Sequence, residues 1–260
     1  MKKLFPLDPR RTLVTHLFAP RSAAEAIAEA RNAEADGAEA VAVEWKLMPE
    51  EFRNAETYRA LIGSVPLPFM FLIYRNDMLG WSDEKHAEML LDASRAGVGM
   101  IDVMGDLFSP APDERTRDPG AIRRQKELIG ELHALGSQVI VSSHPVRPMS
   151  AGEVLAQLLD FEERGADVVK IVTKADTEEE FLESLRATLR ARKELKRAAF
   201  VHLCVGKFGR FQRMTGTSLG TAITFAVHRY HDFFCGDQPA IRAVRAVREN
   251  MHWNIADVNG

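Results

Sequence analysis

The sequence lacks the features that mark several classes of protein. It has two cysteines among 260 residues, Cys204 and Cys235, which fits a reducing compartment and does not suggest a disulfide framework. Neither stands in a CxxC or Cys/His spacing, so the sequence indicates no metal site. No stretch approaches the roughly 18 apolar residues of a transmembrane helix. The basic start MKKLFPLDPRR has no apolar segment behind it. We therefore expect a cytoplasmic protein.

An excess of charge of one sign is also missing. The chain has 34 basic and 37 acidic residues, a net charge of −3 and an ordinary apolar fraction of 46%. This balance provides no overall attraction to nucleic acid or to an anionic membrane. We therefore expect neither as a partner, and look for a small-molecule substrate instead.

What the sequence does contain is an alternation of short apolar runs with longer amphipathic stretches. Each of the eight runs is 7–9 residues long and rich in Val, Ile or Phe, which is typical of buried parallel strands. The runs are TLVTHLFA from Thr12, EAVAVEW from Glu39, PFMFLIY from Pro68, GMIDVMG from Gly99, SQVIVSSH from Ser137, DVVKIVTK from Asp167, AAFVHLCVG from Ala198 and TAITFAV from Thr221.

A helical pattern follows seven of the eight runs. Ser22, Ser150 and Thr177 each precede a glutamate by three residues, the spacing of a helix-starting capping box. Residues 206–216 are Gly-rich and polar, which predicts a loop with a helical turn. Eight strand–helix units in ~250 residues predict a single (β/α)8 TIM barrel over residues 1–260. The alternative is an open doubly wound sheet, but no GxGxxG or Walker loop follows the first run.

Lys170 is the strongest single indication of chemistry. It stands in VVKIV within the sixth run, where burial disfavours the ammonium form and lowers the pKa of the amine. A neutral amine is what attack on a carbonyl to form a Schiff base requires. The alternative is an interior lysine paired with a carboxylate such as Glu44 or Asp102. Lys174 shares the strand parity of Lys170 and is a second candidate nucleophile, nearer the polar end of the run.

Polar residues at the ends of other runs extend this candidate site, because chemistry in such a barrel lies at the carboxyl ends of the strands. His144 ends the run before the one that carries Lys170, so the two would be neighbours, and histidine moves protons at neutral pH. Arg75 and Arg213 are candidates for binding an anionic group, since arginine donates parallel hydrogen bonds to a carboxylate. The alternative for each is a structural role.

These residues stand in motifs that resemble, in order, those of the type I 3-dehydroquinate dehydratases, a family of Schiff-base (β/α)8 enzymes. The resemblance spans roughly residues 12–247. VAVEWK resembles the strand-two E-W-R signature, FLIYRN the strand-three arginine motif, MIDVMGDLF the strand-four D-x-E-L motif, VIVSSHPV the histidine segment, ADVVKIVTKA the lysine segment, GRFQRMTG with SLGTAITF the late arginine segment and last strand, and GDQPAI the closing loop.

The resemblance implies a reaction and a set of site residues. Lys170 would form the imine and His144 would be the general acid/base in the loss of water from 3-dehydroquinate, which gives 3-dehydroshikimate in the shikimate pathway to aromatic amino acids. The imine is the electron sink, so no metal or organic cofactor is implied, and family members are commonly homodimers. The implied substrate-binding residues are Arg213 and Gln238 for the carboxylate, Glu44 and Arg75 for hydroxyls, and Lys46 at the strand-two arginine position.

The sequence departs from the family pattern around the catalytic pair. Lys46 keeps the charge of the strand-two arginine but lacks its planar fork. A hydrogen-bonded carboxylate raises the basicity of a histidine and fixes its tautomer. We therefore expect proton transfer by His144 to be weakened or retuned. The other departures are Leu79 near the position of the glutamate that orients the histidine, Met104 at the strand-four glutamate, Pro145 after the histidine and Phe234 near a closing-loop serine.

Three functions are therefore in competition. The first is dehydration of 3-dehydroquinate. The second is use of the same imine for another hydroxylated keto acid, by dehydration or retro-aldol cleavage. The third is a catalytically silent barrel that binds a shikimate-type acid. The intact pair of Lys170 and His144 argues against the third, and the departures separate the first from the second. Residues 230–238 hold aromatics that suit a lid over the substrate or packing on the rim.

Overall fold

The computed structural model describes residues 2–7, 13–17, 20–45, 48–75, 80–230 and 236–258. Each of the eight apolar runs contains a strand, and every strand pairing is parallel. The strands are β1 (Leu13–Leu17), β2 (Ala40–Glu44), β3 (Phe69–Leu72), β4 (Met100–Met104), β5 (Gln138–Ser143), β6 (Val168–Lys174), β7 (Ala199–Val205) and β8 (Thr224–Ala226).

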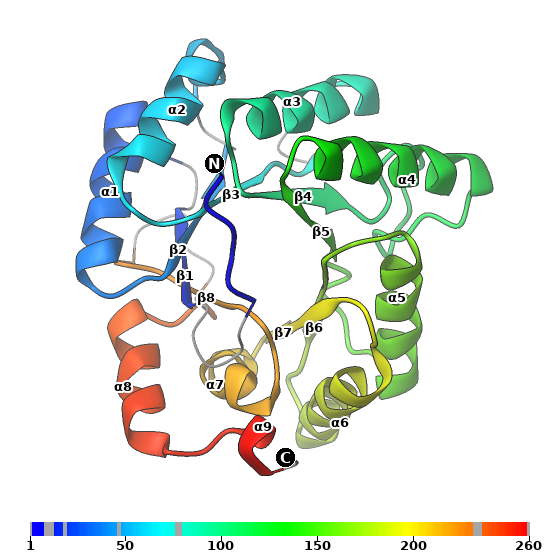
Figure 1. Ribbon diagram of the computed structural model, residues 1–260. Helices are drawn as coiled ribbons and strands as arrows, with labels where there is room; N and C mark the ends of the chain where they lie inside the picture. Colours follow the sequence, from blue (N-terminus) through cyan, green and yellow to red (C-terminus); the bar gives the residue numbers. More distant parts are fainter. Residues whose placement is uncertain are drawn as a thin grey trace.

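The strands form one curled sheet in the order β7-β6-β5-β4-β3-β2-β1-β8. In the view of Figure 1, the helices surround the curled sheet. The strands β7 and β8 are the two ends of the order. Near them, the backbone N–H of Ala222 donates to the carbonyl of Phe200 at 2.8 Å. The predicted strands and their parallel α/β arrangement are confirmed.

The helices between the strands begin where the capping signals predict. Ser150 and Thr177 form complete capping boxes, whereas Ser22 accepts from the Glu25 N–H alone. The loop predicted over residues 206–216 is instead mostly α7, a short helix. The helices are α1 (Ala23–Ala35), α2 (Ala55–Ser64), α3 (Asp83–Ala96), α4 (Pro119–Ala134), α5 (Ala151–Glu163), α6 (Glu178–Glu194), α7 (Gly209–Thr215), α8 (Ile241–Met251) and α9 (Ile255–Val258), with 3-10 turns η1 (Glu50–Phe52) and η3 (Gly216–Leu219).

Strand alternation divides the core into two layers, because successive side chains point to opposite faces. One cluster lines the concave face, with Met100, Ile140 and Val168 among its members. The other packs between the sheet and the helices and includes the intervening strand residues. Side chains two positions further along each strand share the concave face. These are Asp102, Ser142 and Lys170, so polar groups follow directly on an apolar layer.

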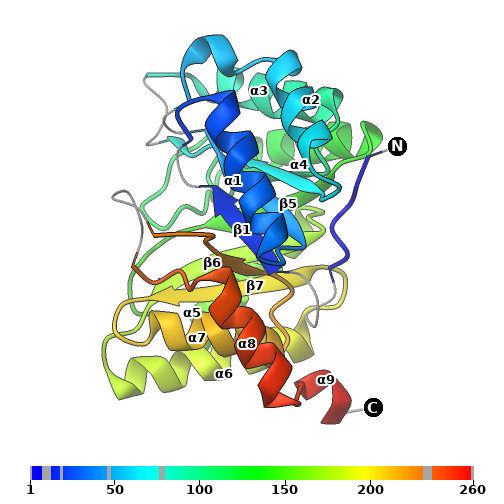
Figure 2. The same ribbon diagram turned by 90° about the vertical axis from the view of Figure 1, so that its left-hand side faces the viewer.

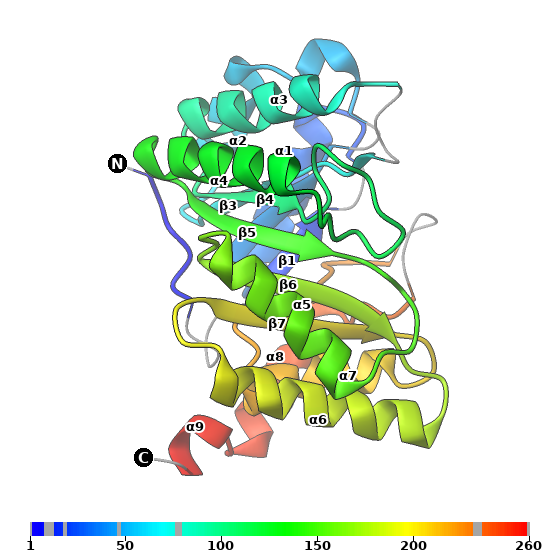
Figure 3. The ribbon, with the colours of Figure 1, turned by 90° about the vertical axis from the view of Figure 1, so that its right-hand side faces the viewer.

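The first and last described segments lie at the amino ends of the strands, opposite their carboxyl ends. Figures 2 and 3 show the strand arrowheads pointing away from the N and C labels. Phe5 is buried and exchanges hydrogen bonds with the Gln138 side chain, at 2.8 Å from its N–H and 3.1 Å to its carbonyl. This segment therefore covers the end of the sheet remote from the polar layer. Within the described ranges, the structure contains no helix long and apolar enough to cross a membrane.

Candidate active site

Lys170 lies in the middle of β6 on the concave face and is 6% exposed. Its Nζ donates to the Tyr74 hydroxyl at 3.0 Å and lies 3.8 Å from Asp102 Oδ2. Burial lowers the pKa of this amine, and the charge of Arg213 lowers it further, against the opposing effect of nearby carboxylates led by Asp102. Both hypotheses for Lys170 therefore find support. The carboxylate neighbour fits a paired interior lysine, and the lowered pKa fits a neutral nucleophile.

Asp102 is the buried carboxylate beside this amine. It is 1% exposed, and its two oxygens accept hydrogen bonds from two hydroxyls. Tyr74 donates to Oδ2 at 2.9 Å and Ser142 donates to Oδ1 at 2.6 Å. Ser142 is opposite Lys170 in the β5–β6 ladder, so strand register alone brings the serine to this place. The hydroxyls satisfy the carboxylate oxygens that burial would otherwise leave without partners.

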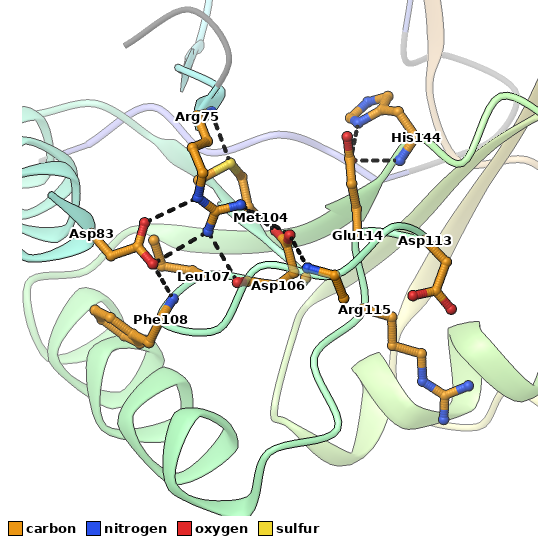
Figure 4. A network of polar contacts seen from close by, with 12 residues as sticks. Arg75, Asp83, Met104, Asp106, Leu107, Phe108, Asp113, Glu114, Arg115 and His144 are labelled. Atoms are coloured by element: carbon orange, nitrogen blue, oxygen red, sulfur yellow. Dashed lines mark hydrogen bonds and ion pairs between the residues drawn. The ribbon is translucent and has the colours of Figure 1, made fainter. Parts of the chain in front are cut away.

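His144 lies at the end of β5 beside this group. Its ring meets the Tyr74 ring edge to face, with centroids 4.6 Å apart. Glu114 Oε2 accepts from the His144 backbone N–H at 2.7 Å and lies 2.9 Å from Nδ1 (Figure 4). A carboxylate only accepts hydrogen bonds, so Nδ1 carries the ring proton and Nε2 keeps its lone pair. Burial lowers the pKa of His144, as does the charge of Lys170, while Glu114 raises it.

The carboxylate partner of His144 corrects an expectation from the sequence. The loss of the family's glutamate near Leu79 predicts a histidine without a carboxylate neighbour, and this is wrong. Leu79 itself lies outside the described residues. Glu114 comes from the connection between β4 and α4, and no motif in the sequence marks it. Burial alone would raise the pKa of Glu114, but its hydrogen bonds with His144 lower the pKa overall.

The β4–α4 connection is clamped in place by buried polar groups. Arg164 donates to the carbonyls of Gly105 at 2.6 Å and Thr116 at 2.9 Å, and Gln125 donates to the Gly105 carbonyl at 3.3 Å. A Cβ atom on Gly105 would lie 2.6 Å from the Glu114 carbonyl oxygen, so only glycine permits this approach. Glu114 also takes a left-handed backbone conformation, with φ 49°. These contacts fix the loop that delivers the carboxylate.

A second polar group lies at the ends of β1 and β2 and in the segment before α8. Glu44 is 4% exposed, and its Oε2 lies 3.2 Å from His16 Nε2. The Gln238 amide donates to His16 Nδ1 at 2.8 Å. The His16 and Phe225 rings pack edge to face, and Lys170 Nζ lies 5.2 Å from the centroid of the same Phe225 ring. Two predicted binding residues, Glu44 and Gln238, are thus linked by a histidine that the sequence motifs did not single out.

The other predicted residues have different outcomes. Arg213 on α7 is 4% exposed, its Nε donates to the Cys204 carbonyl at 3.1 Å, and its charge acts on Lys170. Arg75 instead points to the β4–α4 side, where its guanidinium contacts Asp106 at 2.9 Å and Asp83 at 3.2 Å (Figure 4). Its substrate contact therefore stays a prediction. Lys174, the second candidate nucleophile, lies half-exposed at the end of β6 and pairs with Asp176 at 2.7 Å. The predicted binding residue Lys46 and the departure at Phe234 lie outside the described residues.

The arrangement supports proton transfer next to an amine nucleophile. It joins a lysine of lowered pKa, a histidine with a free Nε2 lone pair, a buried carboxylate and an arginine. Sequence motifs missed three members: Tyr74, His16 and Glu114. Strand parity was a usable signal for Tyr74 and His16, since both are polar side chains at strand ends. In the part of the chain that the structure describes, no group of three or more His, Cys, Asp and Glu side chains is placed to hold a metal ion.

Comparison with known proteins gives a consistent set of relatives. The profile of the family described as Type I 3-dehydroquinase matches residues 18–254. A 3-dehydroquinate dehydratase of Klebsiella pneumoniae subsp. pneumoniae is 30% identical over 173 residues, which cover 64% of this chain and 62% of the relative. One of Salmonella typhimurium is 26% identical over 196 residues, covering 70% and 72%. The chain therefore spans less than two thirds of the length of the Klebsiella relative.

Two crystal structures of 3-dehydroquinate dehydratases share the fold. The one from Geobacillus kaustophilus has a TM-score of 0.78 at 18% identity, and the match covers 92% of this chain and 90% of that chain. The type I enzyme from Clostridium difficile also has a TM-score of 0.78, at 20% identity, with 94% and 93% covered. At these identities the likeness concerns the fold of the chain.

Proposed function

This chain belongs to the type I 3-dehydroquinase family, and on that premise we propose that it is a 3-dehydroquinate dehydratase, a carbon–oxygen hydro-lyase of the shikimate pathway. The observation that carries the proposal is Lys170, a buried amine of lowered pKa next to a histidine whose Nε2 lone pair is free. The substrate is a hydroxylated keto acid, 3-dehydroquinate, and the product is 3-dehydroshikimate.

The chemistry follows from these two side chains. The neutral Lys170 amine attacks the substrate ketone and forms an iminium, which withdraws electrons from the adjacent C–H bond. His144 Nε2 removes that proton as the C–H electron pair forms an enamine C=C bond and the iminium π pair moves to nitrogen. The nitrogen pair then re-forms the C=N bond, the enamine pair forms the new C=C bond, and the hydroxyl leaves. The imidazolium returns the proton to the departing oxygen, so water is released. Hydrolysis of the imine then frees the product and restores the amine. In this scheme the imine is the electron sink, so the proposal needs no metal or organic cofactor.

The polar groups around Lys170 supply the proposed substrate contacts. The charge of Arg213 lowers the pKa of the Lys170 amine, and with Gln238 this arginine would bind the substrate carboxylate. Glu44, with His16 beside it at 3.2 Å, would accept hydrogen bonds from substrate hydroxyls. Lys46 and Arg75 remain proposed contacts from the family pattern. The proposal includes closure of the sheet as a full (β/α)8 barrel, a homodimer and a cytoplasmic location, the last supported by the scarcity of cysteine.

Two measurements on the purified chain test this function. Turnover of 3-dehydroquinate is followed by the absorbance of the enone product. Borohydride reduction with substrate, read by intact mass, reports the imine. We expect turnover, together with an adduct that Lys170→Ala abolishes. Efficient adduct formation with another hydroxylated keto acid and negligible turnover of 3-dehydroquinate would instead identify a related dehydratase or aldolase. No adduct with any such acid would identify a silent barrel.

A further inference from the structure

Tyr74 stands between the two residues of the proposed chemistry. It follows β3, and its side chain reaches across the concave face toward β6 and β5. Its hydroxyl lies 3.0 Å from Lys170 Nζ, and its ring centroid lies 4.6 Å from that of His144. The proposed mechanism gives this residue no task, although its hydroxyl contacts the reacting nitrogen.

The donors and acceptors around the hydroxyl form a directed chain. The Tyr74 hydroxyl donates to Asp102 Oδ2 at 2.9 Å, so its oxygen is left to accept from Lys170 Nζ. Asp102 Oδ1 is already occupied by the Ser142 hydroxyl at 2.6 Å. A proton on the lysine nitrogen therefore has a continuous path through one hydroxyl to one carboxylate oxygen. The direct distance from Nζ to that oxygen is 3.8 Å, too long for a hydrogen bond.

We propose that Tyr74 is a catalytic residue that carries protons between Lys170 Nζ and Asp102 during imine formation, an inference that rests on the proposed Schiff-base function. The hydroxyl acts as a relay that gives one proton as it takes another. Burial, together with the charge of Asp102, raises the pKa of Tyr74 well above its ordinary value. The phenol therefore stays neutral throughout, which suits a relay and excludes a tyrosinate base.

The Nζ lone pair bonds to the substrate carbonyl carbon, and the C=O π pair moves to oxygen. One Nζ proton passes to Tyr74 Oη while the Tyr74 proton passes to Asp102 Oδ2. Asp102 then returns this proton to Tyr74 Oη as the Tyr74 hydroxyl gives its own proton to the oxygen of the adduct, which becomes the carbinolamine hydroxyl. This hydroxyl takes a second proton from solvent and leaves as water. The nitrogen lone pair then forms the C=N bond of the iminium. The tyrosine and the aspartate end as they began.

The experiment compares Tyr74→Phe with wild-type enzyme and with Tyr58→Phe. Phenylalanine keeps the ring that packs on His144 and removes the hydroxyl alone. Tyr58 is a matched control, because it is also buried, at 2% exposed, and packs on Trp45 outside the site. Borohydride trapping at timed intervals measures the rate of adduct formation with 3-dehydroquinate. We expect that rate to fall on the order of 100-fold in Tyr74→Phe, within the usual range of general acid–base catalysis, and to stay at the wild-type value in Tyr58→Phe.

A variant of Asp102, the residue at the end of the relay, distinguishes a proton relay from a tyrosine that only positions its neighbours. Asp102→Asn retains an acceptor for Ser142 but cannot take up a proton. The relay predicts that Asp102→Asn, Tyr74→Phe and the double variant form adduct equally slowly, because one path is cut in each. Additive losses in the double variant, or a fast Asp102→Asn variant, would contradict the relay. If the Asp102 variants do not fold, the solvent isotope effect on adduct formation tests the relay instead. Replacing H2O by D2O should slow adduct formation more in wild type than in Tyr74→Phe.

Trapping with wild-type enzyme separates a failure of the proposed function from a failure of the relay. If wild type forms no adduct with 3-dehydroquinate, that function is wrong, and the same variants are compared with glyoxylate, a small carbonyl acid. A slower glyoxylate adduct in Tyr74→Phe would then support the relay without the dehydratase. Equal rates in wild type and Tyr74→Phe, with either compound, overturn it. An absence of any adduct with both compounds overturns the relay and the function together.

Discussion

Glu114 holds His144 through two hydrogen bonds to one oxygen: Oε2 lies 2.7 Å from the backbone nitrogen and 2.9 Å from Nδ1. The backbone bond fixes the position of the histidine at the strand end. The ring bond fixes its tautomer, with the proton on Nδ1 and the lone pair on Nε2. One carboxylate from a loop therefore sets both the place and the basicity of the proposed general base.

Glu114→Gln should reduce kcat with little change in KM. The neutral amide keeps the size of the side chain but can donate its NH2 group to Nδ1. The ring proton then resides on Nε2, which can no longer act as a base. We expect a fall of about 10- to 100-fold in kcat, since general acid–base catalysis is worth ~10²–10⁴-fold in total. Steady-state kinetics with the enone readout measures it. The borohydride adduct should still form, and an unchanged kcat would remove Glu114 from the mechanism.

The pH dependence of kcat/KM should show an acid limb below the ordinary histidine pKa. Burial and the charge of Lys170 lower the pKa of His144 below the ordinary histidine value, so its Nε2 is still a base at pH values where a free histidine is protonated. Below that lowered pKa the imidazolium cannot accept a proton, and the rate falls. In Glu114→Gln the carboxylate that raises this pKa is gone, so the limb should move to lower pH. A limb that moves to higher pH would contradict this assignment.

His202 should make the fold sensitive to acid. It is fully buried on β7, with Nε2 3.1 Å from the Thr173 hydroxyl and Nδ1 3.0 Å from that of Thr188. Burial lowers its pKa from 6.5 to about 4. The unfolded chain therefore binds a proton first as the pH falls, and the free energy of unfolding decreases from pH 6.5 down to about pH 4. At ~1.4 kcal/mol per pKa unit, the loss is roughly 3 kcal/mol.

Urea unfolding at a series of pH values measures this effect. His202→Gln, which cannot titrate, should show a shallower loss of stability with acid than wild type. A part of the acid sensitivity should remain, because burial also lowers the pKa of His86 to about 4. Identical pH dependence in the variant and in wild type would show that His202 is not kept neutral by the fold.

Arg75 should contribute to stability through the carboxylates it holds. Its guanidinium contacts Asp106, whose side chain is 3% exposed, and Asp83, which also accepts from the Phe108 N–H at 2.8 Å. Arg75→Met leaves Asp106 buried without its cation, and we expect a loss of about 1–3 kcal/mol in the free energy of unfolding. Urea unfolding measures it. A stable variant with a raised KM would instead support direct contact between Arg75 and the substrate.

The strands and the amine were predictable because their signals are local. Each apolar run of seven to nine residues contained a strand, since burial of a parallel sheet demands such runs. Lys170 was conspicuous because a charged side chain interrupts one of them, and His144 because it ends the neighbouring run. The short helix α7 was less clear, since the Gly-rich sequence of residues 206–216 resembles a loop.

The partners of these residues were decided by the tertiary structure. Glu114 reaches His144 because Arg164 and Gln125 clamp the β4–α4 connection, and Arg164 lies 59 residues from the Gly105 carbonyl it binds. Tyr74 reaches Lys170, 96 residues away, because the curled sheet turns β3 and β6 toward the same interior. The sequence by itself determined which strands form and which amine is buried, as these depend on nearest neighbours along the chain. Which carboxylate and which hydroxyl serve that amine depended on loop conformation and sheet curvature, which arise from contacts between distant segments.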